Sequence, residues 1–147
     1  MIKKVEAVSE PDGALVDWVA FNRARSELGA DFVRILGYFR EDGIKSLSAI
    51  EDAMRDRSAT ALVLPAHTLK GDSAQIGAMP LARLAEHVEM TARRCIEHRE
   101  APDELLSVVV RLRPLFQRTM ALCDQAAAPP IMRKPTGFGR KVVFGRA

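Results

Sequence analysis

The apolar residues of this chain recur three or four positions apart over long stretches, and this spacing limits the fold more than any other feature. The clearest such stretch contains Phe32, Ile35, Leu36, Phe39, Gly43, Leu47, Ile50 and Met54. This period places side chains on one side of an α-helix, whereas a half-buried strand would alternate apolar and polar residues. Only the short run 142–144 resembles a strand. The sequence therefore predicts an all-α fold.

The same spacing predicts five helices. We expect a short one that opens with Leu15, Trp18, Val19 and Asn22 and is interrupted at Gly29, and longer ones over about 32–54, 61–76, 80–99 and 102–124. Short connections between long amphipathic helices favour antiparallel neighbours. We therefore expect an antiparallel up-down-up-down four-helix bundle, with the short N-terminal helix packed across one end or side.

Several residues that start, end or bend helices support these boundaries. Asp31 suits the cap or first turn of the second helix, and Gly77 suits a helix stop. Pro80 and Pro102 fit first helical turns, where no amide donor is needed. Pro114 lies inside the last predicted helix and is expected to kink it.

The length of 147 residues fits one domain, which we divide into a polar segment 1–13, a bundle 14–126 and a tail 127–147 rich in proline, glycine and basic residues. The net charge of +3 arises in the tail, since residues 129–147 carry five basic residues and no acid. The rest of the chain has a net charge of −2, so the overall charge does not indicate a nucleic-acid binder.

Two cysteines are too few for a disulfide framework, and no apolar run is long enough for a signal peptide or a membrane span. We therefore expect a cytoplasmic protein with no membrane partner.

One histidine lies on an unusual helical face. At about 100° per residue, His67 points away from the apolar stripe of its helix. The residues around it on that face are Val63, Lys70, Gly71, Ala74 and Ala78. Apart from Lys70, the positions that follow the histidine are small, although glycine costs a helix about 1 kcal/mol relative to alanine. Such a face leaves room for the surface of a partner.

This arrangement suits phosphoryl chemistry. Histidine titrates near pH 6.5 when unperturbed, so much of it is a neutral nucleophile at neutral pH. Its ring nitrogen can attack a phosphoryl group and hold it as a phosphoramidate. Lys70 lies one turn further along and can reach the phosphoryl oxygens as a mobile positive charge.

The segment around the histidine resembles a known signature. It reads Ala66-His67-Thr68-Leu69-Lys70-Gly71-Asp72-Ser73-Ala74-Gln75-Ile76-Gly77-Ala78. Histidine-containing phosphotransfer (HPt) domains typically read His-x-Leu-Lys-Gly-Ser-Ser-Ala-x-x-Gly-Ala. The helical pattern from about Leu15 to Cys123 also resembles that family. Asp72 departs from it by replacing a serine, and Pro65 indicates either a helix start near Leu64 or a kink.

The resemblance implies a phosphorelay intermediate that takes a phosphoryl group from an aspartyl phosphate on one receiver domain and passes it to another. His67 would accept the group, Lys70 would stabilise it, and the small residues would admit the receiver. Partners would be response-regulator receivers and a hybrid histidine kinase, and a monomer suffices. No cofactor is implied, since Mg²⁺ belongs to the receiver. The chain has no nucleotide-binding motif, so we expect no ATP-dependent kinase activity.

Other candidate residues have simpler interpretations. Cys95, His98 and His87 could suggest a metal, but zinc needs more ligands and Cys95 falls on an apolar stripe, so we predict a core thiol and no metal site. Glu86 and Glu89 have no partner motif and are expected on a solvated face.

Two other functions stay open. A module of the same fold could regulate a receiver by binding without transfer. Alternatively, the basic tail could serve an accessory protein at nucleic acid or a membrane surface, although it could equally be solvated or dock on the bundle through Phe138, Val142, Val143 and Phe144.

Overall fold

The computed structural model describes residues 14–128, and all regular structure in that range is helical. Its elements are α1 (Trp18–Leu28), the 3-10 turn η3 (Gly29–Asp31), α2 (Phe32–Arg55), α3 (Ala59–Gln75), α4 (Met79–His98), the 3-10 turn η4 (Asp103–Leu105) and α5 (Leu106–Ala127). The predicted polar segment 1–13 and all but the first two residues of the predicted tail 127–147 lie outside the described residues, and Ala127 still belongs to α5. The all-α prediction is confirmed.

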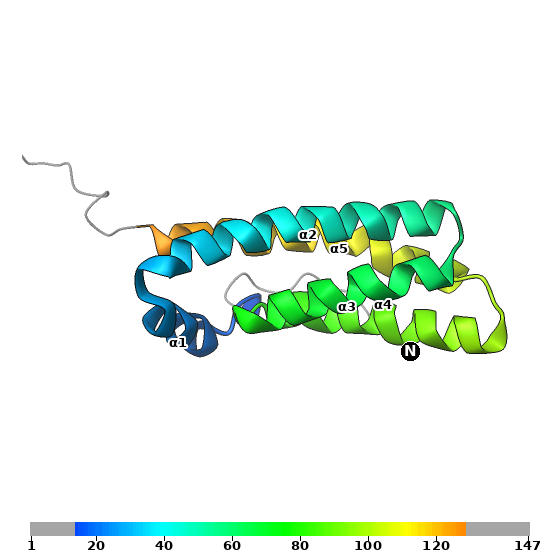
Figure 1. Cartoon of the computed structure of the whole chain (residues 1–147), viewed down its shortest axis with the longest axis horizontal. Coiled ribbons are helices and arrows are strands. Elements are labelled where there is room, and N and C mark those ends of the chain that lie inside the picture. The colour runs from blue at the N-terminus through cyan, green and yellow to red at the C-terminus, as the bar shows by residue number, and fades with distance from the viewer. Residues whose placement is uncertain (1–13, 129–147) are drawn as a thin grey trace, which may run out of the picture.

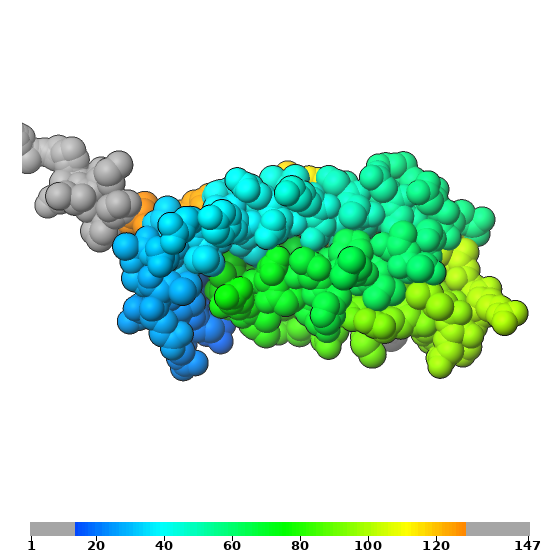
Figure 2. Space-filling view, viewed as in Figure 1, coloured from blue at the N-terminus to red at the C-terminus, as the bar shows by residue number. Residues whose placement is uncertain are grey.

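Each of the four long helices α2 to α5 runs antiparallel to the helix before it in the chain, and α1 crosses one end of the bundle (Figure 1). α3 packs against both α2 and α4, which are its neighbours in the chain. The predicted four-helix bundle with an extra N-terminal helix is therefore confirmed. The packing leaves the outer side of α3 exposed along the face shown in Figure 2.

Several helix boundaries differ from the prediction, including the starts of α3 and α5. α3 begins at Ala59, because the Ser58 hydroxyl accepts a hydrogen bond from the amide of Ala61 at 3.1 Å and caps the helix. α5 begins at Leu106 after η4, so Pro102 precedes a 3-10 turn instead of lying in the first turn of α5. α5 then continues through Pro114 as one helix.

Asp31 occupies the N-cap position of α2 but makes no side-chain capping bond, and its carboxylate pairs with Arg34 instead.

A single apolar core lies between the helices. Its largest fully buried side chains include Phe21, Phe32, Leu47, Ile50, Leu62, Leu69, Leu81, Leu105 and Leu112. The rings of Phe21 and Phe32 meet edge to face with centroids 5.0 Å apart, which ties α1 to α2. The amphipathic spacing that predicted the helices also identified most of this core.

The end of α3 is fixed to the start of α1 through Gly77. Its carbonyl accepts a hydrogen bond from the Asp17 amide at 2.7 Å. Gly77 has a φ of +85°, and a Cβ there would lie 2.7 Å from the Asp17 carbonyl oxygen. A side chain is therefore excluded both by the backbone conformation and by the close approach. The glycine predicted as a helix stop also holds α1 in place.

A glycine in α2 also permits close packing against α5. A Cβ built on Gly43 would lie 2.3 Å from Cε1 of Phe116, whereas a Cβ on Gly37 in the same helix would meet nothing within 4 Å.

We predict that Gly43→Ala lowers the free energy of unfolding by about 1–3 kcal/mol, because the Phe116 ring must move. Gly37→Ala is the matched control and is expected to raise it by up to about 1 kcal/mol, since alanine favours helix. Urea unfolding measures both, and equal effects of the two substitutions would contradict this account of α2–α5 packing.

Candidate functional site

The imidazole of His67 stands on the exposed side of α3. Its side chain is 58% exposed, although Ala66 and Leu69 on the same helix are fully buried. This contrast follows from the helical period, which turns residue 67 away from the core as residues 66 and 69 turn toward it. The exposure expected for a transfer histidine is therefore present.

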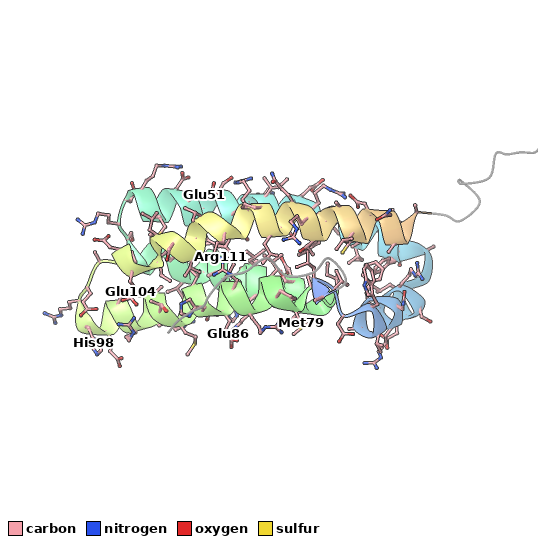
Figure 3. The ribbon with its side chains drawn as sticks, turned by 180° about the vertical axis from the view of Figure 1, so that it is seen from behind. Glu51, Met79, Glu86, His98, Glu104 and Arg111 are labelled. Carbon is pink, nitrogen blue, oxygen red and sulfur yellow. The ribbon has the colours of Figure 1, made fainter. Side chains whose placement is uncertain are left out.

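Behind the histidine lies the carboxylate of Glu89, which α4 provides. One of its oxygens, Oε2, is 3.0 Å from Nδ1 of His67, and the other, Oε1, is 2.9 Å from Nζ of Lys70. The Glu89 side chain is only 4% exposed. The prediction that Glu86 and Glu89 share a solvated face is therefore wrong for Glu89, whereas Glu86 is exposed on the outer side of α4 (Figure 3).

The burial of Glu89 results from the close packing of α3 and α4. Glu89 follows Val88 at the edge of the buried stripe of α4, on the side that α3 covers. In the sequence this position looks polar, and only the contact with the second helix reveals its partners. The nearest sequence signal is Arg93, four residues further along, which is the spacing of a helical ion pair.

Arg93 completes the cluster of charges around Glu89. Its Nε and Nη2 atoms lie 3.1 and 2.9 Å from Oε2 of Glu89, the same oxygen that faces His67. The carboxylate thus contacts His67 and Lys70 from α3 and Arg93 from α4.

These contacts keep Glu89 ionised. Burial acts to raise the pKa of this carboxyl group, but the ammonium group of Lys70 and the hydrogen bonds from Arg93 and His67 together outweigh burial and lower the pKa to about 2. An ionised carboxylate can only accept hydrogen bonds. Nδ1 of His67 must therefore carry the proton in this contact, which leaves Nε2 of the neutral ring with a free electron pair.

The small residues predicted around His67 differ in position. Gly71 and Ala74 are exposed, and Val63 is half-buried and packs against the core. Ala78 does not lie on this face: it is fully buried and precedes α4 as its N-cap. The prediction placed Ala78 on the face of His67 by assuming that the helix continues to residue 78. Instead, α3 ends at Gln75, and Gly77, with its positive φ, turns the chain toward α4.

The two residues that depart from the signature, Pro65 and Asp72, are not among the side chains that contact Glu89. Pro65 is the seventh residue of α3, so α3 neither starts at Leu64 nor stops at the proline. Asp72 is half-buried, and burial together with the negative charge of Asp42 on α2 raises its pKa.

The predicted core thiol is confirmed, since Cys95 is fully buried and burial raises its pKa. The carboxylates of Glu100 and Glu104 come within 4.8 Å of its sulfur, but both are paired with Arg94. Neither His87 nor His98 belongs to that group within the described residues, and Figure 3 shows His98 at the far end of α4. Across residues 14–128, no helix combines the length and apolar character needed to cross a bilayer.

Comparison with known proteins agrees with this arrangement. The Hpt domain family matches residues 34–126, which is more than half of the chain. The crystal structure of histidine-containing phosphotransfer protein B (HptB) from Pseudomonas aeruginosa PAO1 matches with a TM-score of 0.67 and 23% sequence identity, covering 76% of this chain and 93% of that one. This similarity demonstrates a shared fold. No curated protein matches the chain.

The low pKa of Glu89 predicts a specific dependence of stability on pH. Because folding lowers this pKa from 4.5 to about 2, ionised Glu89 stabilises the fold above pH 4.5, and this contribution is lost as the pH falls toward 2. The excess stability of the wild type over Glu89→Gln should therefore shrink by about 2 kcal/mol between pH 7 and pH 3. Urea unfolding across this range measures it, with exposed Glu86→Gln as the control. A difference that does not change with pH would contradict the ionised, buried carboxylate.

Proposed function

The chain belongs to the Hpt domain family, and we propose that it is a phosphorelay intermediate that carries a phosphoryl group on His67 between aspartyl phosphates of receiver domains. Membership of the family gives it a role in histidine phosphotransfer. The observation that carries the finer proposal is the exposed imidazole of His67, held from behind by the ionised carboxylate of Glu89 and flanked by Lys70.

The proposed transfer uses the free electron pair of Nε2. This atom attacks the phosphorus of an aspartyl phosphate, so that a P–N bond forms and the P–O bond to the aspartate breaks. The receiver keeps the released carboxylate. The proton on Nδ1 stays in the hydrogen bond to Glu89, in which Nδ1 and Oε2 are 3.0 Å apart, and the ring becomes a phosphorylated imidazolium. The negative charge of Glu89 stabilises the positive charge that develops on the ring. Passing the group to a second receiver reverses these bond changes.

Lys70 is proposed to stabilise the phosphoryl group. It follows His67 by three residues on α3, and its side chain is 29% exposed, so the ammonium group is accessible from the outer side of the helix. A flexible lysine can turn toward oxygens on a newly bound phosphoryl group as a mobile point charge. Mg²⁺ would come with the receiver, and no residue around His67 is assigned to it here.

The surface beside His67 suits the approach of another protein. A Cβ on Gly71 would meet nothing within 4 Å, so the fold itself does not require glycine there. Because glycine weakens a helix by about 1 kcal/mol relative to alanine, its use in open space favours a role in contact with a partner. Exposed Ala74 extends the small surface, half-buried Val63 borders it, and the apolar side chain of Leu64 is 71% exposed one turn before the histidine. We assign this surface to receiver docking.

Transfer from a labelled receiver tests the proposal. Incubation of the full chain with a phosphorylated receiver domain should transfer an acid-labile phosphate to it, and His67→Gln should abolish the label, because glutamine has no nucleophilic ring nitrogen. His87→Gln is the matched control, since His87 is also an exposed helical histidine but lies on α4. It should keep full labelling. Persistent labelling of His67→Gln would refute the assignment, whereas receiver binding without any label on the wild type would favour a binding module that does not transfer phosphate.

A further inference from the structure

We propose that Arg93 is a positioning residue for this transfer: it holds the Glu89 carboxylate when Lys70 leaves that carboxylate to bind the phosphoryl group. The inference rests on the proposed function and extends it to a residue on a second helix. This role would account for the pairing of one buried carboxylate, that of Glu89, with two cations, Lys70 and Arg93.

The two oxygens of Glu89 divide these contacts between them. Lys70 contacts Oε1 at 2.9 Å, whereas both Arg93 nitrogens and Nδ1 of His67 approach Oε2. Departure of Lys70 therefore leaves the contacts at Oε2 intact. The proton on Nδ1 can keep its place through the reaction.

Without Arg93, the departure of Lys70 would be strongly unfavourable. Glu89 is 4% exposed, and as long as the His67 ring is neutral, a buried carboxylate that loses Lys70 would have no cation left to compensate for its lost hydration. Lys70 would then stay with Glu89 and contribute less to the phosphoryl group. With Arg93 in place, Glu89 remains neutralised and Lys70 is free to exchange partners.

The position of Arg93 supports a role at the site over a general surface role. Its side chain is 55% exposed, so its removal opens no cavity in the core. The neighbouring Arg94 is similar in chemistry and 44% exposed, but it pairs with Glu100 and Glu104 instead of Glu89. The two adjacent arginines thus provide a matched pair for experiment.

Titration of the phosphoryl group by ³¹P NMR tests the inference. The full chain is phosphorylated on His67 with phosphoramidate as a small donor, and the last ionisation of the bound phosphoryl group is followed with pH. A nearby cation lowers the pKa of such a group, so Lys70→Ala should raise this pKa by about one unit. Arg93→Ala should raise it by a similar amount, because Lys70 is then retained by Glu89, and should slow transfer from a phosphorylated receiver by about tenfold.

Three further variants separate this role from a structural one. Arg93→Lys should restore most of the wild-type pKa and rate, because it returns a cation to Glu89. Arg93→Ala should add no further shift of the phosphoryl pKa in the Lys70→Ala background, where no lysine remains to be released. Arg94→Ala should behave as the wild type. A change in thermal stability alone would show only that Arg93 supports the helix.

The outcomes distinguish the two proposals. A phosphoryl pKa that Lys70→Ala raises and Arg93→Ala leaves unchanged would overturn the role of Arg93 and leave the proposed function standing. A wild-type chain that accepts no phosphoryl group from either phosphoramidate or a receiver would overturn the proposed function, and the role of Arg93 with it.

Discussion

The carboxylate of Glu89 is the interaction on which the rest of the site depends. A buried charge is tolerated only when it is paired and hydrogen-bonded, and here the partners come from two helices. The contact between α3 and α4 therefore does more than close the core. It sets which ring nitrogen of His67 carries the proton, and it holds the ammonium group of Lys70 against the same carboxylate.

Helix packing and one turn hold the cluster of Glu89, His67, Lys70 and Arg93 in place. α3 packs between α2 and α4, so its inner side is fully buried and its outer side carries His67 and Gly71. The turn at Gly77 joins α3 to α4 and also anchors α1, which fixes one end of both site helices. A nucleophile on a rigid helix can present the same geometry to more than one partner, as the proposed carriage between two receivers requires.

The sequence predicted the parts of this arrangement that depend on one helix at a time. His67 and Lys70 follow from the helical period and from the signature, and the bundle follows from the amphipathic stripes. Glu89 was missed because its burial depends on a contact with another helix, which no local pattern records. Ala78 was misplaced because the end of α3 is decided by the turn at Gly77 and its contact with Asp17, and Pro65 proved compatible with a continuous helix.

The most direct measurement of the central claim is the tautomer of the His67 ring, read from its ¹⁵N chemical shifts in the full unphosphorylated chain at a pH where the ring is neutral. The account predicts a proton on Nδ1, held by Glu89, and an unprotonated Nε2. A ring with its proton on Nε2 would contradict it, because the carboxylate would then not be orienting the nucleophile.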